Sequence, residues 1–380
     1  MIKRLGDICT FVGGGTPSKK NPDFFNGSIP WATVRDMNVR VIKTTEHSIT
    51  PDAVQQSATN IIPQGEVVIS THVGLGKVCF LGQDTAINQD LKAVIPNGGL
   101  SRRYLYYWFV SKADELIANG KGATVKGVTL DFVKNLKIQV MPEREQETVS
   151  DTLDKVNRII PLADSQVARL DQLVKSRFVE MFGDEKRFPS VTVGDVFTVQ
   201  GPKRIHKEEW TSEGVPFYRV SNLSDLLEGR KTISNNFISR SRFEELKAVE
   251  QVPETGDVLV TARGTLGRCY VVKPHDEFYF QDGMITWLAD RSERITLPYF
   301  LQAVQSQTFK RQYEGKSSGT TVAYMTIGQL AKYRLPLPPL VLQREFAAFV
   351  EKVDKLAFAA RQRRDIAQKL YRAKMQEFFG

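Results

Sequence analysis

The sequence predicts an α+β protein with two similar globular domains separated by two long antiparallel, coiled-coil-like helices. The main observation is an internal repeat, because the segment 142–183 matches the segment 339–380 without a gap, and Gly380 lies 197 residues after Gly183. A second observation is that the parts before these segments contain short runs of strand-forming residues. A repeat of this length indicates two copies of one structural unit, related by a pseudo-two-fold axis.

The repeat divides the chain into four parts. We expect a first globular domain over 1–142, a central helical arm over 143–183, a second globular domain over 184–339 and a C-terminal arm over 340–380. The two globular parts match at short framework elements: Leu5-Gly6-Asp7-Ile8 with Val193-Gly194-Asp195-Val196, Ile29-Pro30-Trp31 with Val215-Pro216-Phe217, and Gln89-Asp90 with Gln281-Asp282.

Strand signals dominate the middle of each globular part. The β-rich runs 67–70 and 258–261 follow a Gly-acid turn, and each leads into a Gly-rich loop and a second apolar run. Helices are expected at 103–110 and 299–304. Their aromatic side chains are interpreted as core residues and not as a platform on which bases stack.

The arms show helical periodicity. Apolar residues of the first arm recur in steps of four and three, which predicts a heptad seam, and the seam is less regular in the second arm, where Arg361–Arg364 interrupt it. The predicted seam residues are Val149, Leu153, Val156, Ile160, Val167, Leu170 and Val174 in the first arm, and Val353, Leu356, Ala360, Ala367 and Leu370 in the second. Pro161 predicts a kink or a break in the first arm, because proline removes a backbone hydrogen bond.

The simplest packing sets the two arms antiparallel, seam to seam. A straight helix over 150–182 would be about 50 Å long at 1.5 Å per residue, and one turn of B-DNA separates equivalent groove positions by about 34–36 Å. Two DNA-binding domains joined by such a spacer could therefore contact one face of a duplex. The alternative is an intermolecular coiled coil that only dimerises the protein.

Composition narrows the class of protein. A net charge of +9 favours a polyanionic partner such as nucleic acid. Because no apolar run approaches the length of a membrane span, we expect a cytoplasmic protein with no membrane partner. The three cysteines, Cys9, Cys79 and Cys269, show no metal-ligand spacing and are expected to be buried thiols.

Signs of catalysis are absent from the sequence. The run Gly13-Gly14-Gly15-Thr16-Pro17 lacks the Gly-Lys-Ser/Thr end of a phosphate-binding loop and is interpreted as a flexible connection. The four histidines are scattered, without metal-ligand spacing. We therefore expect a binding protein with no catalytic residues, no metal and no cofactor of its own.

The combination of elements resembles a known family. The opening Leu5-Gly6-Asp7-Ile8, the run Gly14-Gly15-Thr16-Pro17, the element Ile29-Pro30-Trp31, the strands after Gly65-Glu66 and Gly256-Asp257, and the entry Leu335-Pro336-Leu337-Pro338-Pro339 to the second arm occur in this order. Together with the repeat over the whole chain, they are similar to the specificity subunits of type I restriction-modification systems.

The resemblance implies a specific role. Each globular domain would be a target-recognition domain that reads one half of a bipartite sequence in double-stranded DNA. The helices would set the length of the unread spacer and dock two modification (methyltransferase) subunits, which carry S-adenosylmethionine and methylate adenine N6. Restriction subunits would complete an ATP-dependent endonuclease. The alternatives are a stand-alone DNA-binding or coiled-coil scaffold protein, and an enzyme with an unrecognised site.

DNA-contacting residues are expected in three loops of each domain. Base edges are read by donors and acceptors such as Arg, Lys and Thr, and phosphates are bound by cations and by backbone amides of Gly-rich loops. Arg35 and Arg219, which follow the Pro-aromatic elements at shifted positions, are secondary candidates. The main candidates are Lys19, Lys20, Thr71, His72, Lys77, Lys121, Thr124 and Lys126 in the first domain, and Lys203, Arg204, Arg263, Thr265, Arg268, Lys316 and Thr320 in the second.

Overall fold

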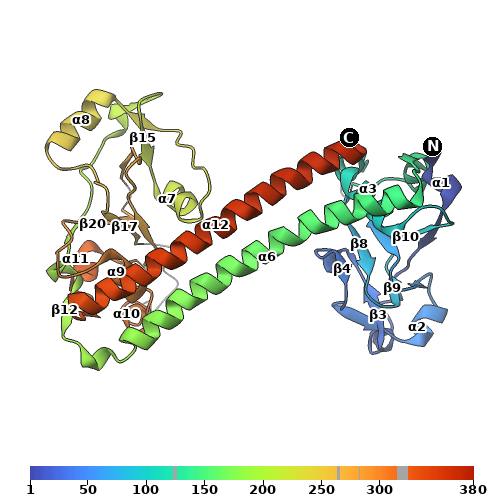
Figure 1. The fold of residues 1–380 in the computed structure, drawn as a ribbon, viewed down its shortest axis with the longest axis horizontal. Helices are drawn as coiled ribbons and strands as arrows, with labels where there is room; N and C mark the ends of the chain where they lie inside the picture. The colour runs from blue at the N-terminus through green and yellow to red at the C-terminus, as the bar shows by residue number, and fades with distance from the viewer. Residues whose placement is uncertain (123–125, 263–265, 282, 315–323) are drawn as a thin grey trace. The chain divides into compact units, whose positions relative to one another are not determined.

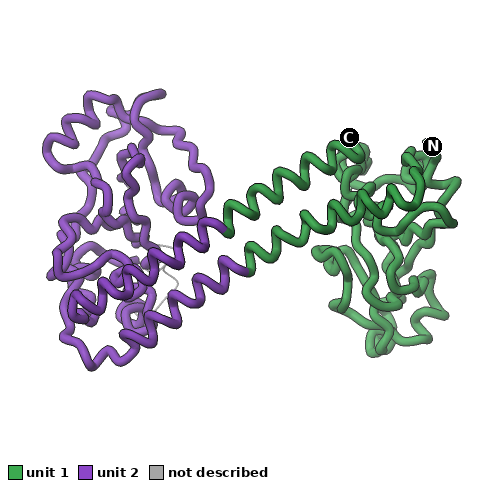
Figure 2. The backbone as a smooth tube through the Cα atoms, in the orientation of Figure 1, with its two compact units in different colours: residues 1–165, 360–380 green, residues 166–359 purple. Residues whose placement is uncertain are grey.

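The computed structural model describes residues 1–122, 126–262, 266–281, 283–314 and 324–380 (Figure 1). The chain forms two compact units, which Figure 2 distinguishes by colour: residues 1–165 with 360–380, and residues 166–359. Helices α6 (Glu143–Phe182) and α12 (Leu340–Phe379) each contribute to both units. Each unit therefore contains one globular domain, the beginning of one long helix and the end of the other.

The first globular domain contains two main sheets. One has the order β2-β10-β7-β8-β4, formed by Cys9–Gly13, Leu91–Pro96, Val67–Ser70, Val78–Leu81 and Val41–Ile42. The other has the order β5-β3-β9-β6, formed by His47–Ile49, Ile29–Ala32, Thr85–Ile87 and Asn60–Ile62. A small sheet pairs β1 (Ile2–Arg4) with β11 (Lys137–Gln139).

Short helices cover these sheets. They are α1 (Leu5–Ile8), η1 (Pro22–Phe25), η2 (Val34–Asp36), α2 (Pro51–Gln55), α3 (Arg102–Ser111), α4 (Ala113–Ala118) and α5 (Leu130–Asn135). All six side chains from Tyr104 to Phe109 on α3 are buried. The prediction that these aromatic residues belong to the core is therefore confirmed.

The second globular domain repeats this arrangement. One sheet has the order β13-β20-β17-β18, formed by Thr198–Gln200, Ile285–Ala289, Val258–Thr261 and Cys269–Val271. The other has the order β14-β16-β15-β19, formed by Trp210–Thr211, Phe237–Ile238, Val215–Tyr218 and Tyr279–Phe280. Strand β12 (Ser190–Thr192) pairs with β21 (Arg334–Pro336). The helices are η3 (Glu185–Arg187), η4 (Val193–Asp195), η5 (Lys207–Glu209), α7 (Val220–Leu227), α8 (Arg240–Ala248), α9 (Leu297–Ala303), α10 (Gln307–Lys310) and α11 (Ile327–Lys332).

The long helices run antiparallel. Asp164 on α6 pairs with Arg364 on α12 at 3.4 Å, and Arg177 further along α6 pairs with Glu345 at 2.8 Å. The partner numbers on α12 fall as the α6 numbers rise, as an antiparallel pair requires. The first-arm seam residues are buried or half-buried, as predicted. Arg364 occupies a seam position itself, where its stem is partly covered and its charge is paired.

The predicted seam of the second arm was wrong at two positions. Leu356 is 54% exposed and Leu370 is 43% exposed. The buried positions are the neighbouring Ala357, together with Ala360 and Ala367 as predicted, and the half-buried Tyr371 takes the place of Leu370. The prediction placed the larger leucines in the seam, but in the structure it is the residue that follows each leucine that is buried, fully or in part. The seam therefore lies one residue further along the helix at both positions.

Pro161 does not break the first arm. Helix α6 continues through it from Glu143 to Phe182, so of the kink or break that was expected, the break does not occur. Pro161 lies on the exposed face of the helix, where water can occupy the place of the missing hydrogen bond.

The aromatic end of each long helix packs into the globular domain that belongs to the other half of the sequence. On α6, Phe182 is 2% exposed, and its ring centroid lies 4.9 Å from that of Tyr299 on α9 and 5.6 Å from that of Phe346 on α12. On α12, Phe379 lies 5.2 Å from Tyr104 on α3 between ring centroids. Each domain is therefore completed by the end of a helix that begins directly after the other domain in the sequence.

A buried carboxylate fixes the junction of helices in the first unit. Asp154 on α6 is 8% exposed, accepts hydrogen bonds from Tyr107 and Arg103 on α3, and pairs with Arg40 at 2.5 Å. Burial would raise the pKa of this carboxyl, but the hydrogen bonds from Tyr107 and Arg103 and the charge of Arg40 lower that pKa below its ordinary value. The ring of Tyr371 on α12 lies 6.4 Å from that of Tyr107.

Phe182 and Phe379 occupy equivalent positions of the repeat but differ in burial, and this difference predicts unequal costs of truncation. Phe182→Ala should destabilise the second unit by about 3–5 kcal/mol, because it leaves a cavity among packed aromatic rings. Phe379→Ala should cost clearly less, since Phe379 is only half-buried. Urea unfolding of both variants measures the two losses, and an equal or larger loss for Phe379→Ala would contradict this packing.

The lowered pKa of Asp154 predicts an acid-sensitive junction. Because the pKa of Asp154 is lower in the folded state than in the unfolded state, the ionised carboxylate stabilises the fold when the pH is above the unfolded-state pKa. This stabilisation is lost as the pH falls through the folded-state pKa. The loss should therefore begin below about pH 4, the ordinary range of an aspartate. Thermal unfolding between pH 7 and pH 3 should show a steeper decline for the wild type than for Asp154→Asn. Parallel curves would show that the carboxylate makes no such contribution.

Candidate nucleic-acid interface

In each domain, two neighbouring strands run parallel and end side by side. Strand β3 pairs with β9 through Trp31↔Ala86 and Ala32↔Ile87, and β15 pairs with β19 through Phe217↔Tyr279 and Tyr218↔Phe280. The carboxyl ends of parallel neighbours meet at one sheet edge. The residues that follow these strands are therefore brought together in both domains.

The same two residue types follow these strands in both halves. Arg35 lies three residues after the end of β3, and Arg219 directly follows β15. Gln89 follows β9, and Gln281 directly follows β19. Both arginines and Gln89 are exposed, and Gln281 is half-buried. We call Arg35 with Gln89, and Arg219 with Gln281, the strand-end pairs.

The strand-end pair of the first domain lines an open cavity of about 810 Å³. Its aromatic wall contains Trp31, with Phe25 5.8 Å and His47 6.3 Å away between ring centroids. Its polar lining is formed by Thr16, Lys19, Thr33, Arg35, Asn88, Gln89 and Asp90. The cavity therefore combines an apolar surface with hydrogen-bond donors and acceptors and with side chains of both positive and negative charge.

The glycine run before Thr16 is a packed element of this cavity. A Cβ at Gly14 would lie 2.0 Å from the carbonyl oxygen of Ile87, so no larger residue fits there. Gly15 donates its N–H to that oxygen at 3.0 Å and accepts from the Trp31 indole at 3.2 Å. The interpretation of this run as a flexible connection was therefore wrong, since the run fixes Thr16, whose hydroxyl bonds the Gln89 side chain.

The second domain has a corresponding cavity of about 620 Å³ at its own strand ends. The guanidinium of Arg219 lies over the Trp210 ring at 5.2 Å, and Trp210 lies 5.6 Å from Phe217 between ring centroids. The Gln281 side-chain oxygen accepts from the backbone N–H of Ile205. Arg204, His206, Lys207 and Glu208 complete the charged lining.

The chemistry of both cavities suits the edges of DNA bases. Arginine donates two hydrogen bonds to guanine, glutamine pairs with adenine, and an apolar surface contacts the thymine methyl group. The remaining described lining differs, because the first cavity includes Thr16, Thr33 and Asn88 and the second includes His206, Lys207 and Glu208. The two cavities are therefore built on one frame but present different patterns of charge and hydrogen bonding.

Several predicted DNA contacts lie at or beside these cavities. Lys19 and Arg204 line them, and their neighbours Lys20 and Lys203 are exposed. His72, Lys121 and Lys126 are exposed on the first domain. Thr124, Arg263, Thr265, Lys316 and Thr320 lie outside the described residues.

Three other residues that were predicted to contact DNA bind other groups of the protein in this structure. Thr71 is 1% exposed, and its hydroxyl donates to the Asp90 backbone oxygen at 3.2 Å, so it is not available to DNA here. The Lys77 ammonium donates to the Val34 carbonyl at 3.3 Å and to Asn38 Oδ1 at 2.7 Å. Arg268 pairs with Glu228 at 3.4 Å.

The strand-end pairs were not among the main DNA-contacting candidates predicted from the sequence. Gln89 and Gln281 were matched as part of the repeat without a DNA-contacting role, and Arg35 and Arg219 were only secondary candidates. Their repetition in both halves was the available signal. The sequence does not show that β3 and β9, or β15 and β19, are parallel neighbours, and that geometry brings the residues together.

Three further features of the described residues concern metal binding, thiol reactivity and membrane insertion. Among them, no group of three or more His, Cys, Asp or Glu side chains is placed to hold a metal ion. Burial raises the pKa of each of the three thiols to about 12, which leaves them as unreactive thiols. In the described part of the chain, no helix has the length and apolar character of a membrane span.

Comparisons with known proteins agree with this architecture. The chain is 34% identical over 164 residues to the type I restriction enzyme EcoR124I/EcoR124II specificity subunit of Escherichia coli, an alignment that spans 41% of each chain. It is 25% identical over 383 residues to the MjaIX specificity subunit of Methanocaldococcus jannaschii, covering 92% of this chain and 85% of that relative.

A solved structure shares the fold. The crystal structure of the type I restriction-modification S subunit from M. genitalium matches with a TM-score of 0.60 at 15% sequence identity, covering 100% of this chain and 96% of that one. The family model for the type I restriction modification DNA specificity domain matches residues 1–170 and 185–368. The chain therefore belongs to the family of type I restriction-modification DNA specificity domains, and it contains two such domains.

Proposed function

We propose that this chain is the DNA sequence-specificity subunit of a type I restriction-modification complex, and that each globular domain reads one half of a bipartite target. The observation that carries the proposal is that an arginine and a glutamine, Arg35 with Gln89 and Arg219 with Gln281, follow the same pair of parallel strands in both domains. The surrounding cavities differ, so the two half-sites differ in sequence.

The long helices have the second role in this proposal. Helices α6 and α12 set the length of the unread spacer and dock two modification subunits. The repeat supports this, since two equivalent helical segments offer two equivalent docking surfaces to two copies of one partner. The modification subunits carry S-adenosylmethionine and methylate adenine N6, and restriction subunits add the ATP-dependent nuclease.

Adenine methylation in cells that produce this chain with its modification subunits tests the proposal. The wild-type chain should give a split motif with two different halves. Arg35→Ala should relax the motif in one half only, and Arg219→Ala in the other half only. Loss of a well-placed arginine contact costs about 1–3 kcal/mol of discrimination against the wrong base, which is roughly a 5- to 150-fold change in preference at that position.

Arg240→Ala is the matched control. Arg240 is an exposed arginine of the second domain that pairs with Glu277 at 2.6 Å and does not line the cavity. It should leave the motif unchanged. A motif that stays intact in Arg35→Ala and Arg219→Ala would contradict the reading role of the strand-end pairs. Methylation without this chain, or none with it, would favour a scaffold protein without methyltransferase partners.

A further inference from the structure

Arg40 connects the cavity of the first domain to the long helices. It lies five residues after Arg35, on the segment that leaves strand β3. Its guanidinium pairs with Asp154 on α6 at 2.5 Å. It also lies over the rings of Tyr106 and Tyr107 on α3, at 5.1 and 5.3 Å from their centroids. One side chain therefore links the strand-end segment to two helices.

The segment between Arg35 and Arg40 is held at several points. Thr33 donates its backbone N–H to Asp36 Oδ2 at 2.8 Å, which closes a capping box over η2. The Lys77 ammonium contacts both Val34 and Asn38. The carbonyl of Arg40 accepts from the N–H of Phe80 at 2.8 Å. These contacts connect the positions around Arg35 to Arg40 by hydrogen bonds as well as through the backbone.

The described residues of the second unit do not form this cluster at the equivalent place. Tyr104 and Tyr299 are equivalent, because their hydroxyls donate to Gln139 and Pro336, which lie 197 residues apart. By this match Arg103 corresponds to Pro298. The 197-residue offset of the arms places Glu351 at the position of Asp154.

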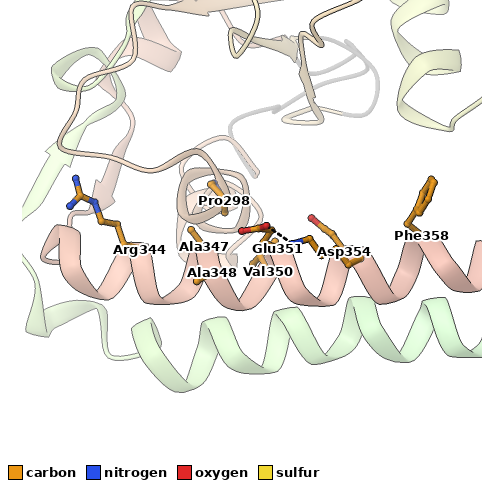
Figure 3. A pocket seen from close by; sticks show the side chains of 9 residues that line it. Pro298, Arg344, Ala347, Ala348, Val350, Glu351, Asp354 and Phe358 are labelled. Atoms are coloured by element: carbon orange, nitrogen blue, oxygen red, sulfur yellow. Dashed lines mark hydrogen bonds and ion pairs between the residues drawn. The ribbon is translucent and has the colours of Figure 1, made fainter.

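An open groove of about 770 Å³ occupies that place in the second unit, between Pro298 and helix α12 (Figure 3). Glu351 pairs there with Lys355, one turn along the same helix, at 2.7 Å. Its side chain is 67% exposed, whereas that of Asp154 is 12% exposed. The carboxylate of the second unit therefore binds within its own helix, and the carboxylate of the first unit binds the globular domain.

We propose that Arg40 is a positioning residue that couples occupancy of the first domain's cavity to the helical pair at Asp154. The inference rests on the proposed function, because the occupant is the DNA half-site. DNA that fixes Arg35 also fixes Arg40 against Asp154 and the α3 rings, and the coupling is reciprocal. The helices thus respond to the first half-site through a contact that Glu351 does not make in the second unit.

Hydrogen exchange of the full chain, with and without a duplex that carries the mapped methylation motif, tests this coupling. In the wild type, DNA should slow exchange in residues 30–40 and also in residues 150–158 of α6. The second effect should be at least about fivefold, the lower end of typical coupling between sites. A duplex altered only in the first half-site should lose the α6 effect, and one altered only in the second half-site should keep it.

Two variants separate coupling from simple structural support. Arg40→Met should keep the protection of residues 30–40 by DNA but lose that of residues 150–158. Arg103→Met removes another partner of the same carboxylate from a residue outside the strand-end segment, and it should keep both effects. If Arg40→Met fails to fold, Arg40→Lys retains the charge without the planar fork and should weaken the α6 effect.

The outcomes distinguish this inference from the proposed function. A response of α6 in Arg40→Met equal to that of the wild type, or an equal loss in Arg103→Met, would overturn the coupling while leaving the reading role intact. Protection of residues 30–40 without any wild-type effect on α6 would do the same. A duplex that protects neither segment would contradict the proposed function, and the coupling would fall with it.

Discussion

The structure depends on the insertion of each long helix's aromatic end into the domain formed by the other half of the sequence. Phe182 at the end of α6 packs against Tyr299 of the second domain and Phe346 of α12. At the end of α12, Phe379 packs against Tyr104 of the first domain. Part of each domain's core comes from a helix that begins directly after the other domain in the sequence, and we therefore expect domain folding to depend on helix pairing. This explains why the match of the arms extends without a gap to their last residues.

One frame then supports two different sites. The framework elements repeat because they build the same sheets, and the parallel neighbours β3–β9 and β15–β19 place an arginine and a glutamine at equivalent sheet edges. Exposed lining residues such as Lys19 in the first domain and Lys207 in the second differ more readily, because they lie outside the buried core. A symmetric frame can therefore support recognition of an asymmetric target. The cluster around Asp154 adds a second asymmetry, since among the described residues Asp154 pairs with the strand-end segment of the first domain whereas Glu351 pairs within its own helix.

The sequence was most informative where the repeat and the periodicity agree. The β-rich runs, the aromatic helices and the extent of the two arms follow from local pattern. The seam of the second arm did not follow from local pattern. Leucine is a stronger apolar signal than alanine, yet in the structure Ala357 is buried and Leu356 is exposed. Local pattern does not show that a small side chain fits the space between two helices better than a larger neighbouring side chain does.

The candidate site was harder to predict. Loops rich in lysine and glycine attracted attention, but Lys77 and Arg268 bind partners within the protein, and Thr71 is buried. The residues that line the cavities come from segments more than 50 positions apart, such as Arg35 and Gln89. Only the pairing of β3 with β9 brings them together, and no local feature of the sequence encodes the direction of that pairing.

The interdependence of domains and helix ends is tested most directly by the first half of the chain alone. A fragment of residues 1–183 carries one globular domain and the helix end Glu180-Met181-Phe182-Gly183, which matches Glu377-Phe378-Phe379-Gly380. In such a fragment, Phe182 of one copy can occupy the place of Phe379 in another. Analytical ultracentrifugation should show a folded dimer that Phe182→Ala dissociates. A stable folded monomer would contradict the claim that each domain requires the helix end of another half.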